Sequence, residues 1–373
     1  MATPAVPSLE IDPEFLLTWG AGSFSLGYHV ATVCGSRNEG LNQAFEGMLK
    51  LRENGRQARE SGSAPTLDPR KFRDPERTAT GARRASVALR RLQTLWFNTG
   101  TLCNITCQNC YIESSPRNDR LLYLTRDEAA SYLDEIERDG WGTEEIGFTG
   151  GEPFMNPYFL SMVEDCLARR FRVLVLTNAM RPMQRCRRKL LDIKDRLDDK
   201  LTLRVSLDHF TAERHEEERG TRTFMPTLEG LIWLAQSGFR VAVAGRTMWG
   251  DAVQEQRAGY ARLFAQHAIP IDAGNPSQLV LFPEMDASAD VPEITEACWD
   301  ILGKSPADVM CASSRMVVKR KGNERPVVLA CTLIPYDPQF ELGETLKESL
   351  RPVLLNHPYC AKFCVLGGAS CSP

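Results

Sequence analysis

The sequence predicts an α/β protein built around an open, partial (βα)6 TIM-like barrel, with an N-terminal extension and a small cysteine-rich α+β region at its C-terminal end. Two observations predict the barrel. Six short apolar runs lie between residues 95 and 282, and helical patterns separate them. This alternation is typical of a parallel sheet with helical crossovers, and six units are too few for a closed eight-fold barrel. In such folds the ligand site lies at the C-terminal ends of the strands.

The expected strands and helices follow one another in a regular order. The strands share short apolar runs, and their ranges are 95–97, 145–148, 173–176, 201–207, 240–244 and 278–282. The helices between them are expected at 125–139, 158–170, 187–197, 224–237 and 251–267. The first helix begins with a capping box, in which Thr125 is the N-cap and Glu128 the third helical residue.

The barrel is expected over residues 93–289. The segments before and after it lack its regular alternation of strands and helices. Residues 1–92 are expected to form an extension with a short helix after Asp12, helical spacing over 38–54 and an exposed linker over 52–91, with a little helix near its end. Residues 290–373 are expected to form a second small region. It contains a hairpin over 317–335, a short helix near 343–351 and a tail with several cysteines.

Composition excludes several classes of protein. The chain has 373 residues, 43% hydrophobic and 25% charged, which excludes a disordered or fibrous chain. The net charge of -3 gives no general attraction to nucleic acid. No apolar run approaches the ~20 residues of a membrane span. The N-terminal residues show no secretory signal, so we expect a cytoplasmic protein without membrane or nucleic-acid partners.

Twelve cysteines are unusual for such a chain. In a reducing cytosol, cysteines bind metal or act in catalysis more often than they form disulfides. Eight of the twelve fall into two groups, one near residue 107 and one beyond residue 310. The other four are isolated, and we expect them to be small structural residues: Cys34, Cys166, Cys186 and Cys298.

The first group lies in the loop after the first strand, as Cys103-x3-Cys107-x2-Cys110. A four-iron cluster usually takes four cysteines, so three thiolates without a fourth local partner predict an iron with an open position. The alternative is a structural zinc site, which needs a fourth Cys or His to complete its tetrahedron. No histidine lies between His29 and His209, and the sequence therefore favours the cluster.

A second motif, Gly150-Gly151-Glu152-Pro153, follows the second strand. Together with the cysteine triad it resembles the radical S-adenosylmethionine (radical SAM) superfamily over roughly residues 93–285. The resemblance implies a [4Fe-4S] cluster on the triad and S-adenosylmethionine bound by this motif and by residues at the ends of later strands, namely Asn178, Ser206, Asp208 and Arg246. Relatives carry an aromatic residue before the third cysteine, where this chain has Asn109, and Tyr111 is expected to take its place.

The resemblance also implies the chemistry. One electron, from an external flavodoxin-type or ferredoxin-type donor, cleaves S-adenosylmethionine to methionine and a 5′-deoxyadenosyl radical, which abstracts hydrogen from a substrate. The substrate is a small molecule or a peptide, and the alternative within the family is an enzyme that matures peptides or proteins, such as ribosomally made natural products or sulfatases. A different class of function is a non-catalytic iron–sulfur or zinc scaffold.

In the second group, cysteines flank the expected hairpin, and a helix and a compact cysteine cluster follow. This arrangement resembles the auxiliary-cluster domains called SPASM and twitch. Five thiols are present where the full SPASM pattern has seven, which implies one auxiliary [4Fe-4S] cluster with one thiol spare. The candidate ligands are Cys311, Cys331, Cys360, Cys364 and Cys371. The alternatives are a zinc site, which His357 could join, and unliganded thiols or disulfides. We expect His357 to pack locally instead.

Two further segments carry weaker expectations. The charged stretch Glu213–Arg222 reads as a solvated helix and loop. His209, beside Asp208 at a strand end, is expected to be structural, with an acid–base role near the substrate as the alternative.

Overall fold

The computed structural model describes residues 66–197, 200–283 and 285–368. In this part of the chain the main sheet has the strand order β10-β9-β8-β2-β3-β4-β5-β6-β7. The six predicted strands are confirmed, and each pairs with the next in parallel. Their bounds are β2 Thr94–Asn98, β3 Glu145–Thr149, β4 Arg172–Thr177, β5 Leu201–Ser206, β6 Arg240–Arg246 and β7 Leu279–Phe282.

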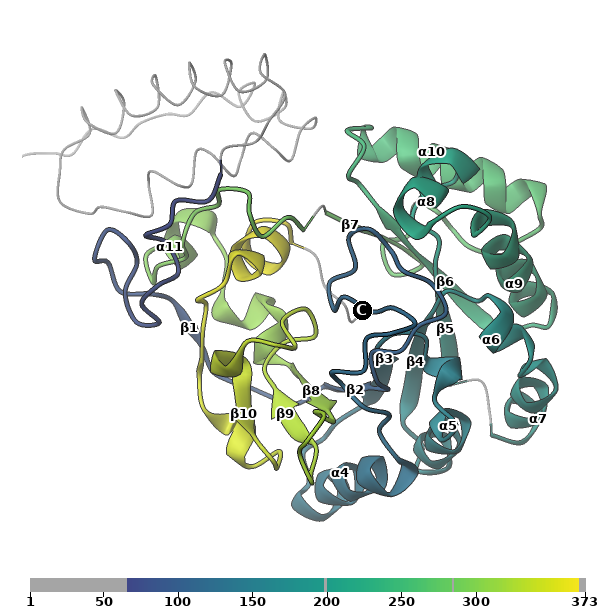
Figure 1. The fold of residues 1–373 in the computed structure, drawn as a ribbon, viewed down its shortest axis with the longest axis horizontal. Helices are drawn as coiled ribbons and strands as arrows, with labels where there is room; N and C mark the ends of the chain where they lie inside the picture. The colour runs from purple at the N-terminus through teal and green to yellow at the C-terminus, as the bar shows by residue number, and fades with distance from the viewer. Residues whose placement is uncertain (1–65, 198–199, 284, 369–373) are drawn as a thin grey trace, which may run out of the picture.

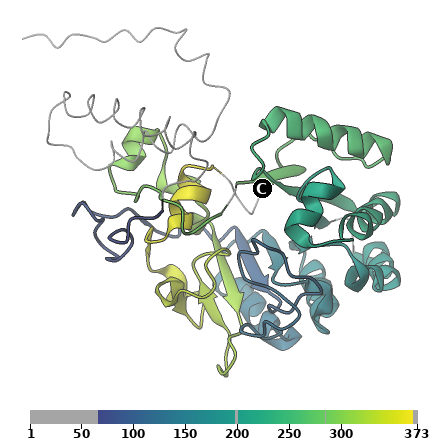
Figure 2. The same cartoon turned by 45° about the horizontal axis from the view of Figure 1, so that its top comes forward.

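The five predicted crossover helices are confirmed, and the described chain adds three shorter ones. Figure 1 shows helices α4 to α10 along one side of the strands, and the same arrangement is seen in the turned view of Figure 2. The capping box of Thr125 and Glu128 begins α4 as predicted. The helices are α4 Arg126–Asp139, α5 Phe159–Ala168, α6 Arg181–Gln184, α7 Arg187–Leu197, α8 Ala212–Arg219, α9 Phe224–Gln236, α10 Val253–Gln266 and α11 Cys298–Leu302.

The sheet separates two hydrophobic cores, because successive side chains of a strand point to opposite faces. Leu95 and Phe97 of β2 pack into the core under the helices, and Val175 of β4 joins them. Trp96 and Leu174, which alternate with them, pack into the second core with the C-terminal region. The inner face of the partial barrel is therefore covered by the C-terminal part of the chain.

The C-terminal strands continue the main sheet. β8 (Ser314–Val318) pairs with β2 in parallel, and Thr94 lies opposite Ser314. The predicted hairpin is confirmed, since β9 (Val327–Leu329) pairs with β8 in antiparallel fashion, and β10 (Glu341–Gly343) follows β9. The division of the chain at residue 290 stays a prediction.

The helix predicted near 343–351 is wrong. This segment forms the end of β10 and one 3-10 turn at Glu348–Leu350. Gly343 has a φ of +133°, which no helix contains, and the backbone N–H groups of Leu346 and Lys347 donate to the carboxylate of Glu135 in α4. These two backbone N–H groups are therefore bonded to a side chain of α4 and not to carbonyl groups of a local helix.

Where the structure describes the linker predicted over 52–91, from residue 66, many of its side chains are exposed as expected, but the prediction of an unattached linker is wrong. This segment packs against residues 288–296, and β1 (Ser86–Val87) pairs with β11 (Val353–Leu354) where a little helix was expected. Arg84 is buried and its guanidinium lies 2.6 Å from the carboxylate of Glu293. The same carboxylate accepts the backbone N–H groups of Phe72 and Ala79, so the segment is fixed by a buried ionic site.

Several expectations fall outside the described residues. These are the helix after Asp12, the helical spacing over 38–54, Cys34 and Cys371. In the part of the chain that can be described, no helix is long and apolar enough to cross a membrane.

Candidate functional site: a thiol-lined cavity at the strand ends

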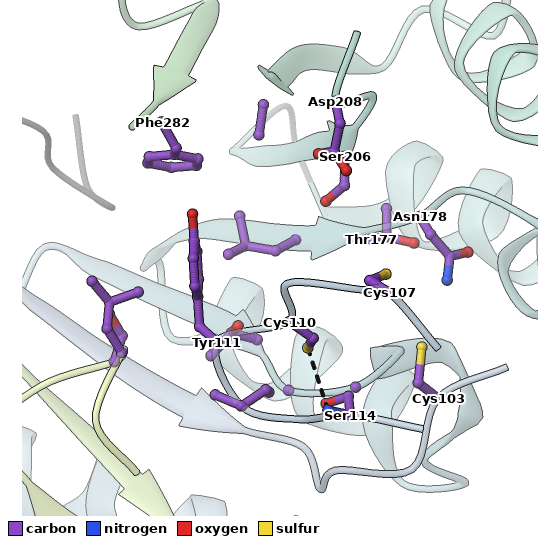
Figure 3. A pocket seen from close by; sticks show the side chains of 18 of the residues that line it. Cys103, Cys107, Cys110, Tyr111, Ser114, Thr177, Asn178, Ser206, Asp208 and Phe282 are labelled. Carbon is purple, nitrogen blue, oxygen red and sulfur yellow. Dashed lines mark hydrogen bonds between the residues drawn. The ribbon is translucent and has the colours of Figure 1, made fainter. Parts of the chain in front are cut away.

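A cavity that opens to solvent lies at the C-terminal ends of the barrel strands. Its lining includes the three thiols of the first cysteine group, and Figure 3 shows them below the ends of β4 and β5. The polar ends of the strands face the thiols across this space. The predicted site residues that line the cavity together are Cys103, Cys107, Cys110, Tyr111, Gly150, Gly151, Asn178, Ser206, Asp208 and Arg246.

Glu152 and Pro153 are not part of this lining. The Glu152 carboxylate is buried and accepts hydrogen bonds from the Thr177 hydroxyl at 2.8 Å and the Asn178 backbone N–H at 2.9 Å. Burial raises the pKa of Glu152 to about 7, although these hydrogen bonds act in the opposite direction. Glu152 therefore ties the loop after β3 to the end of β4. A direct contact of Glu152 or Pro153 with a cofactor stays a prediction.

The two glycines of the motif allow the β3 loop to approach the cysteine loop. A Cβ atom on Gly151 would lie 2.1 Å from the carbonyl oxygen of Leu102, and one on Gly150 would lie 2.6 Å from that of Gly100. Gly150 also has a φ of +131°, a conformation that other residues rarely adopt. The backbone N–H of Gly151 donates to Gly100 at 2.8 Å. The close approach is thus made to the backbone that leads into Cys103.

Helix α8 holds the loop that carries the cysteines. The carboxylate of Glu218 accepts the backbone N–H of Asn109 at 3.0 Å and its side-chain amide at 2.8 Å. The backbone carbonyl of Glu218 accepts the N–H of Gln108 at 2.8 Å. Gln108 and Asn109 both lie between Cys107 and Cys110. Asn109 is the residue that stands where an aromatic residue was expected.

The expectation of a solvated stretch over Glu213–Arg222 is therefore wrong for its inner face. His215 and Glu218 are fully buried, while Glu217 is exposed. His215 and Glu218 are three residues apart, which places them on one face of a helix. This three-residue spacing is the sequence signal that could have predicted that His215 and Glu218 share a buried helix face.

Asp208 is engaged by two arginines, the buried Arg246 and the largely buried Arg219. Arg219 donates to both of its oxygens, at 2.7 and 3.1 Å, and Arg246 lies 3.7 Å away. Burial opposes ionisation, but the charges of Arg219 and Arg246 prevail and lower the pKa of Asp208. Arg246 also lies 3.5 Å from Glu218, with its guanidinium 4.8 Å from the centre of the Tyr111 ring. The wall of the cavity is thus a charge-balanced network, and Arg219 is a member that the sequence reasoning missed.

The cavity thiols are suited to binding metal. Burial raises the pKa of Cys103 to about 12 and that of Cys107 to about 11, so both are protonated at neutral pH until a metal displaces the proton. A structural zinc site would want a fourth Cys or His ligand to complete its tetrahedron. A [4Fe-4S] cluster takes one thiolate per iron. Three thiols on one loop, without a histidine, fit the cluster.

Residues next to members of the second cysteine group also line this cavity. The thiols of Cys311, Cys331 and Cys364 lie close enough to Cys360 to raise its pKa further after the effect of burial. Thr332 and Phe363, which belong to the two segments carrying these cysteines, line the cavity together with Leu333. Cys371 lies outside the described residues. Four of the five candidate ligands therefore gather beside the space that the first three face.

The remaining candidates have local roles. His357 packs against Phe340 and Tyr359, and its Nδ1 accepts the Tyr359 backbone N–H, as expected for local packing. His209 Nδ1 bonds Thr211, and the ring does not line the cavity. Cys166 and Cys298 are buried in the two cores, and Cys186 packs against the first.

Comparison with known proteins identifies the barrel. The radical SAM superfamily model matches residues 97–258. The chain is 27% identical to the antilisterial bacteriocin subtilosin biosynthesis protein AlbA of Bacillus subtilis over 281 residues, which are 70% of this chain and 59% of AlbA. It is 32% identical to the mycofactocin maturase MftC of Mycobacterium tuberculosis over 137 residues, 37% of this chain and 33% of MftC. The chain thus spans less than two thirds of the length of these curated relatives.

Among solved structures, the fold is similar to Streptococcus suis SuiB bound to its precursor peptide SuiA. The TM-score is 0.52 at 13% identity, and the match covers 85% of this chain and 72% of SuiB. At this identity the likeness concerns the fold alone. It extends beyond the barrel into the C-terminal region, because it covers most of the chain.

Proposed function

The chain belongs to the radical SAM superfamily, and on this premise we propose that it is an enzyme that uses a [4Fe-4S] cluster and S-adenosylmethionine to modify a peptide. The observation that carries the proposal is the convergence of three thiols and the polar strand ends on one cavity. Neither group of residues alone would indicate the reaction. Together they supply a place for a cluster with an open iron and a polar wall for its ligand.

The residues have separate tasks in this proposal. Cys103, Cys107 and Cys110 would hold the cluster, and the loop after β3 would present Gly150 and Gly151 to the methionine part of the cofactor. When bound, these cofactors supply a 5′-deoxyadenosyl radical that abstracts hydrogen from the substrate. The protein positions the reactants and excludes water from them. Trp96, Tyr111, Leu176 and Phe282 form apolar parts of the wall that would do so.

The C-terminal cysteines support a second, auxiliary cluster. Of the five candidate thiols, Cys311, Cys331, Cys360 and Cys364 would hold it. Segments on either side of these cysteines line the cavity, so a substrate there would lie between the two cysteine groups. We propose that the auxiliary site accepts an electron from the substrate after hydrogen is removed.

The substrate class is proposed from the relatives. One is named for bacteriocin biosynthesis, another for mycofactocin maturation, and SuiB was solved with a precursor peptide. A small-molecule substrate is the alternative. We propose a flavodoxin-type or ferredoxin-type protein as the external electron donor.

The first experiment measures iron and S-adenosylmethionine cleavage. After anaerobic reconstitution, the full chain is expected to hold about eight iron atoms and to release 5′-deoxyadenosine on addition of dithionite. The Cys103→Ala/Cys107→Ala/Cys110→Ala variant is expected to hold about four iron atoms and release none. A wild-type protein with a full complement of iron that neither binds nor cleaves S-adenosylmethionine would instead be a scaffold.

The second experiment concerns the substrate. Short peptides encoded beside the gene are incubated with the reconstituted enzyme, S-adenosylmethionine and reductant, and analysed by mass spectrometry. A change in peptide mass that requires S-adenosylmethionine and the triad cysteines is expected. If no such peptide changes while small-molecule candidates are consumed, the peptide assignment is wrong and the enzyme assignment stands.

A further inference from the structure

Arg315 is a buried cation beside the second cysteine group. It is the second residue of β8 and is 1% exposed. Its guanidinium donates to the backbone carbonyl oxygens of Cys311 at 2.7 Å, Ser314 at 2.8 Å, and Ser349 at 3.0 and 3.1 Å. Across the ranges that the structure describes, no carboxylate forms an ion pair with it.

Such an environment satisfies the hydrogen-bond donors of Arg315 but leaves its charge without a counter-ion. Burying a charge is costly unless an opposite charge lies near it. Elsewhere in this chain, the buried Arg84 faces Glu293 and the well-buried Arg219 faces Asp208. Arg315 departs from this rule, and one of its hydrogen bonds goes to the backbone carbonyl oxygen of Cys311, a member of the second cysteine group.

A cluster bound by cysteine thiolates provides the missing negative charge. Four thiolates exceed the positive charge of the iron–sulfur core, so the bound cluster carries a net negative charge, which is one of the factors that set its reduction potential. The hydrogen bond that the Arg315 guanidinium donates to the backbone carbonyl oxygen of Cys311 holds the cation at this site. A nearby positive charge stabilises the more negative, reduced form.

We propose that Arg315 is the built-in counter-charge of the auxiliary cluster, that it raises the reduction potential of this cluster, and that Cys311 is one of the ligands. The proposal rests on the auxiliary cluster put forward above. It gives Arg315 a positioning and tuning role, without contact with substrate. It also explains why the Arg315 guanidinium is buried in the C-terminal region, where its hydrogen bonds to carbonyl groups do not neutralise its positive charge.

The test uses the full-length Cys103→Ala/Cys107→Ala/Cys110→Ala protein, so that only the auxiliary cluster is observed. Its reduction potential is measured by an anaerobic redox titration followed by electron paramagnetic resonance. Arg315→Gln is expected to shift the potential to a more negative value, and Arg315→Lys, which keeps the charge, is expected to shift it less. The control is Arg325→Gln, which removes a charge from an exposed position in the same region.

The outcomes separate the two proposals. Absence of iron from the triad-free protein would overturn both the auxiliary cluster and the role of Arg315. A bound cluster whose potential is the same in the Gln variant would overturn only the role of Arg315, and so would a Lys variant shifted as far as the Gln variant. If Arg315→Gln does not fold, Cys311→Ser decides, since it is expected to lose the iron of this cluster and full retention would contradict the proposal.

Discussion

Glu218 accepts two hydrogen bonds from Asn109, one from the backbone N–H and one from the side-chain amide. Asn109 immediately precedes Cys110, so the end of α8 fixes the segment between the second and third cysteines. An aromatic residue at this position has no side-chain amide to donate in this way. The departure from the common motif is thus matched by a carboxylate elsewhere in the chain, and the two residues act as one anchor.

The first prediction follows from this anchor. Glu218→Ala removes the acceptor of both Asn109 hydrogen bonds, and loss of a group that orients a ligand typically lowers metal affinity by about 10–100-fold. We expect a marked decrease in the iron bound by the triad after reconstitution, measured as iron and sulfide per chain.

The control for this variant is the adjacent Glu217→Ala. Glu217 is exposed and contacts only the Trp249 indole among the bonds described for it. It is expected to bind iron as the wild type does. Equal iron content in the two variants would mean that the contact with Asn109 does not support the cysteine loop.

The second prediction concerns the close approach at Gly151. Gly151→Ala places a Cβ atom 2.1 Å from a backbone oxygen of the cysteine loop, so the two loops must move apart. Overpacking of this kind costs about 1–3 kcal/mol or more of unfolding free energy. We expect a lower melting temperature and reduced 5′-deoxyadenosine release. Gly274→Ala is the comparison, because the nearest atom to its Cβ belongs to the flexible side chain of Asp272 and a wild-type melting curve is expected.

The third prediction tests the buried pair that fixes the segment before β1. Arg84→Met leaves the Glu293 carboxylate buried without its cation, and loss of one partner of a buried pair costs about 3–5 kcal/mol. Arg83→Met removes the neighbouring arginine, whose pair with Glu296 is exposed and contributes about 0–1 kcal/mol. Urea unfolding should separate the two variants clearly. Similar unfolding midpoints would show that residues 66–91 are held by other contacts.

The fourth prediction is a pH dependence of stability. Burial lowers the pKa of His215 to about 4, below its value of 6.5 in the unfolded chain. Between pH 6.5 and about 4 the unfolded state binds the proton first, so the unfolding free energy falls as the pH falls, by about 1 kcal/mol per pH unit for this group. At neutral pH and above, this effect is absent.

The variant His215→Gln removes that titration. We expect its unfolding free energy to fall less steeply than that of the wild type over the same pH range, measured by urea denaturation at several pH values. His267→Gln, at the end of α10, serves as the matched substitution of a less buried histidine. An unchanged slope in His215→Gln would assign the acid sensitivity to other groups.

Local pattern predicted the barrel well, because the apolar runs and helical spacings that define it are contained in short stretches of sequence. The capping box of Thr125 and Glu128 is an example, since both partners lie within four residues. The motifs at the strand ends could be brought together for a related reason: parallel strands end at the same edge of the sheet.

Contacts between distant segments were not accessible in this way. The parallel pairing of β2 with β8 joins residues 94–97 to 314–317, and nothing in either strand specifies the partner. Arg84 was assigned to a linker because its partner, Glu293, lies in another region of the sequence. Glu218 was missed because a run of charged residues hides the single buried face that it shares with His215.

The placement of β8 beside β2 has a consequence for biosynthesis. On the ribosome, β2 and the cysteine loop emerge well before β8, the strand that pairs with one edge of β2. Long-range pairings of this kind form late and leave strand edges exposed in the meantime. Assembly of the cysteine loop into its final surroundings is therefore expected to follow the synthesis of β8, so that iron loading is coupled to the formation of this strand pair.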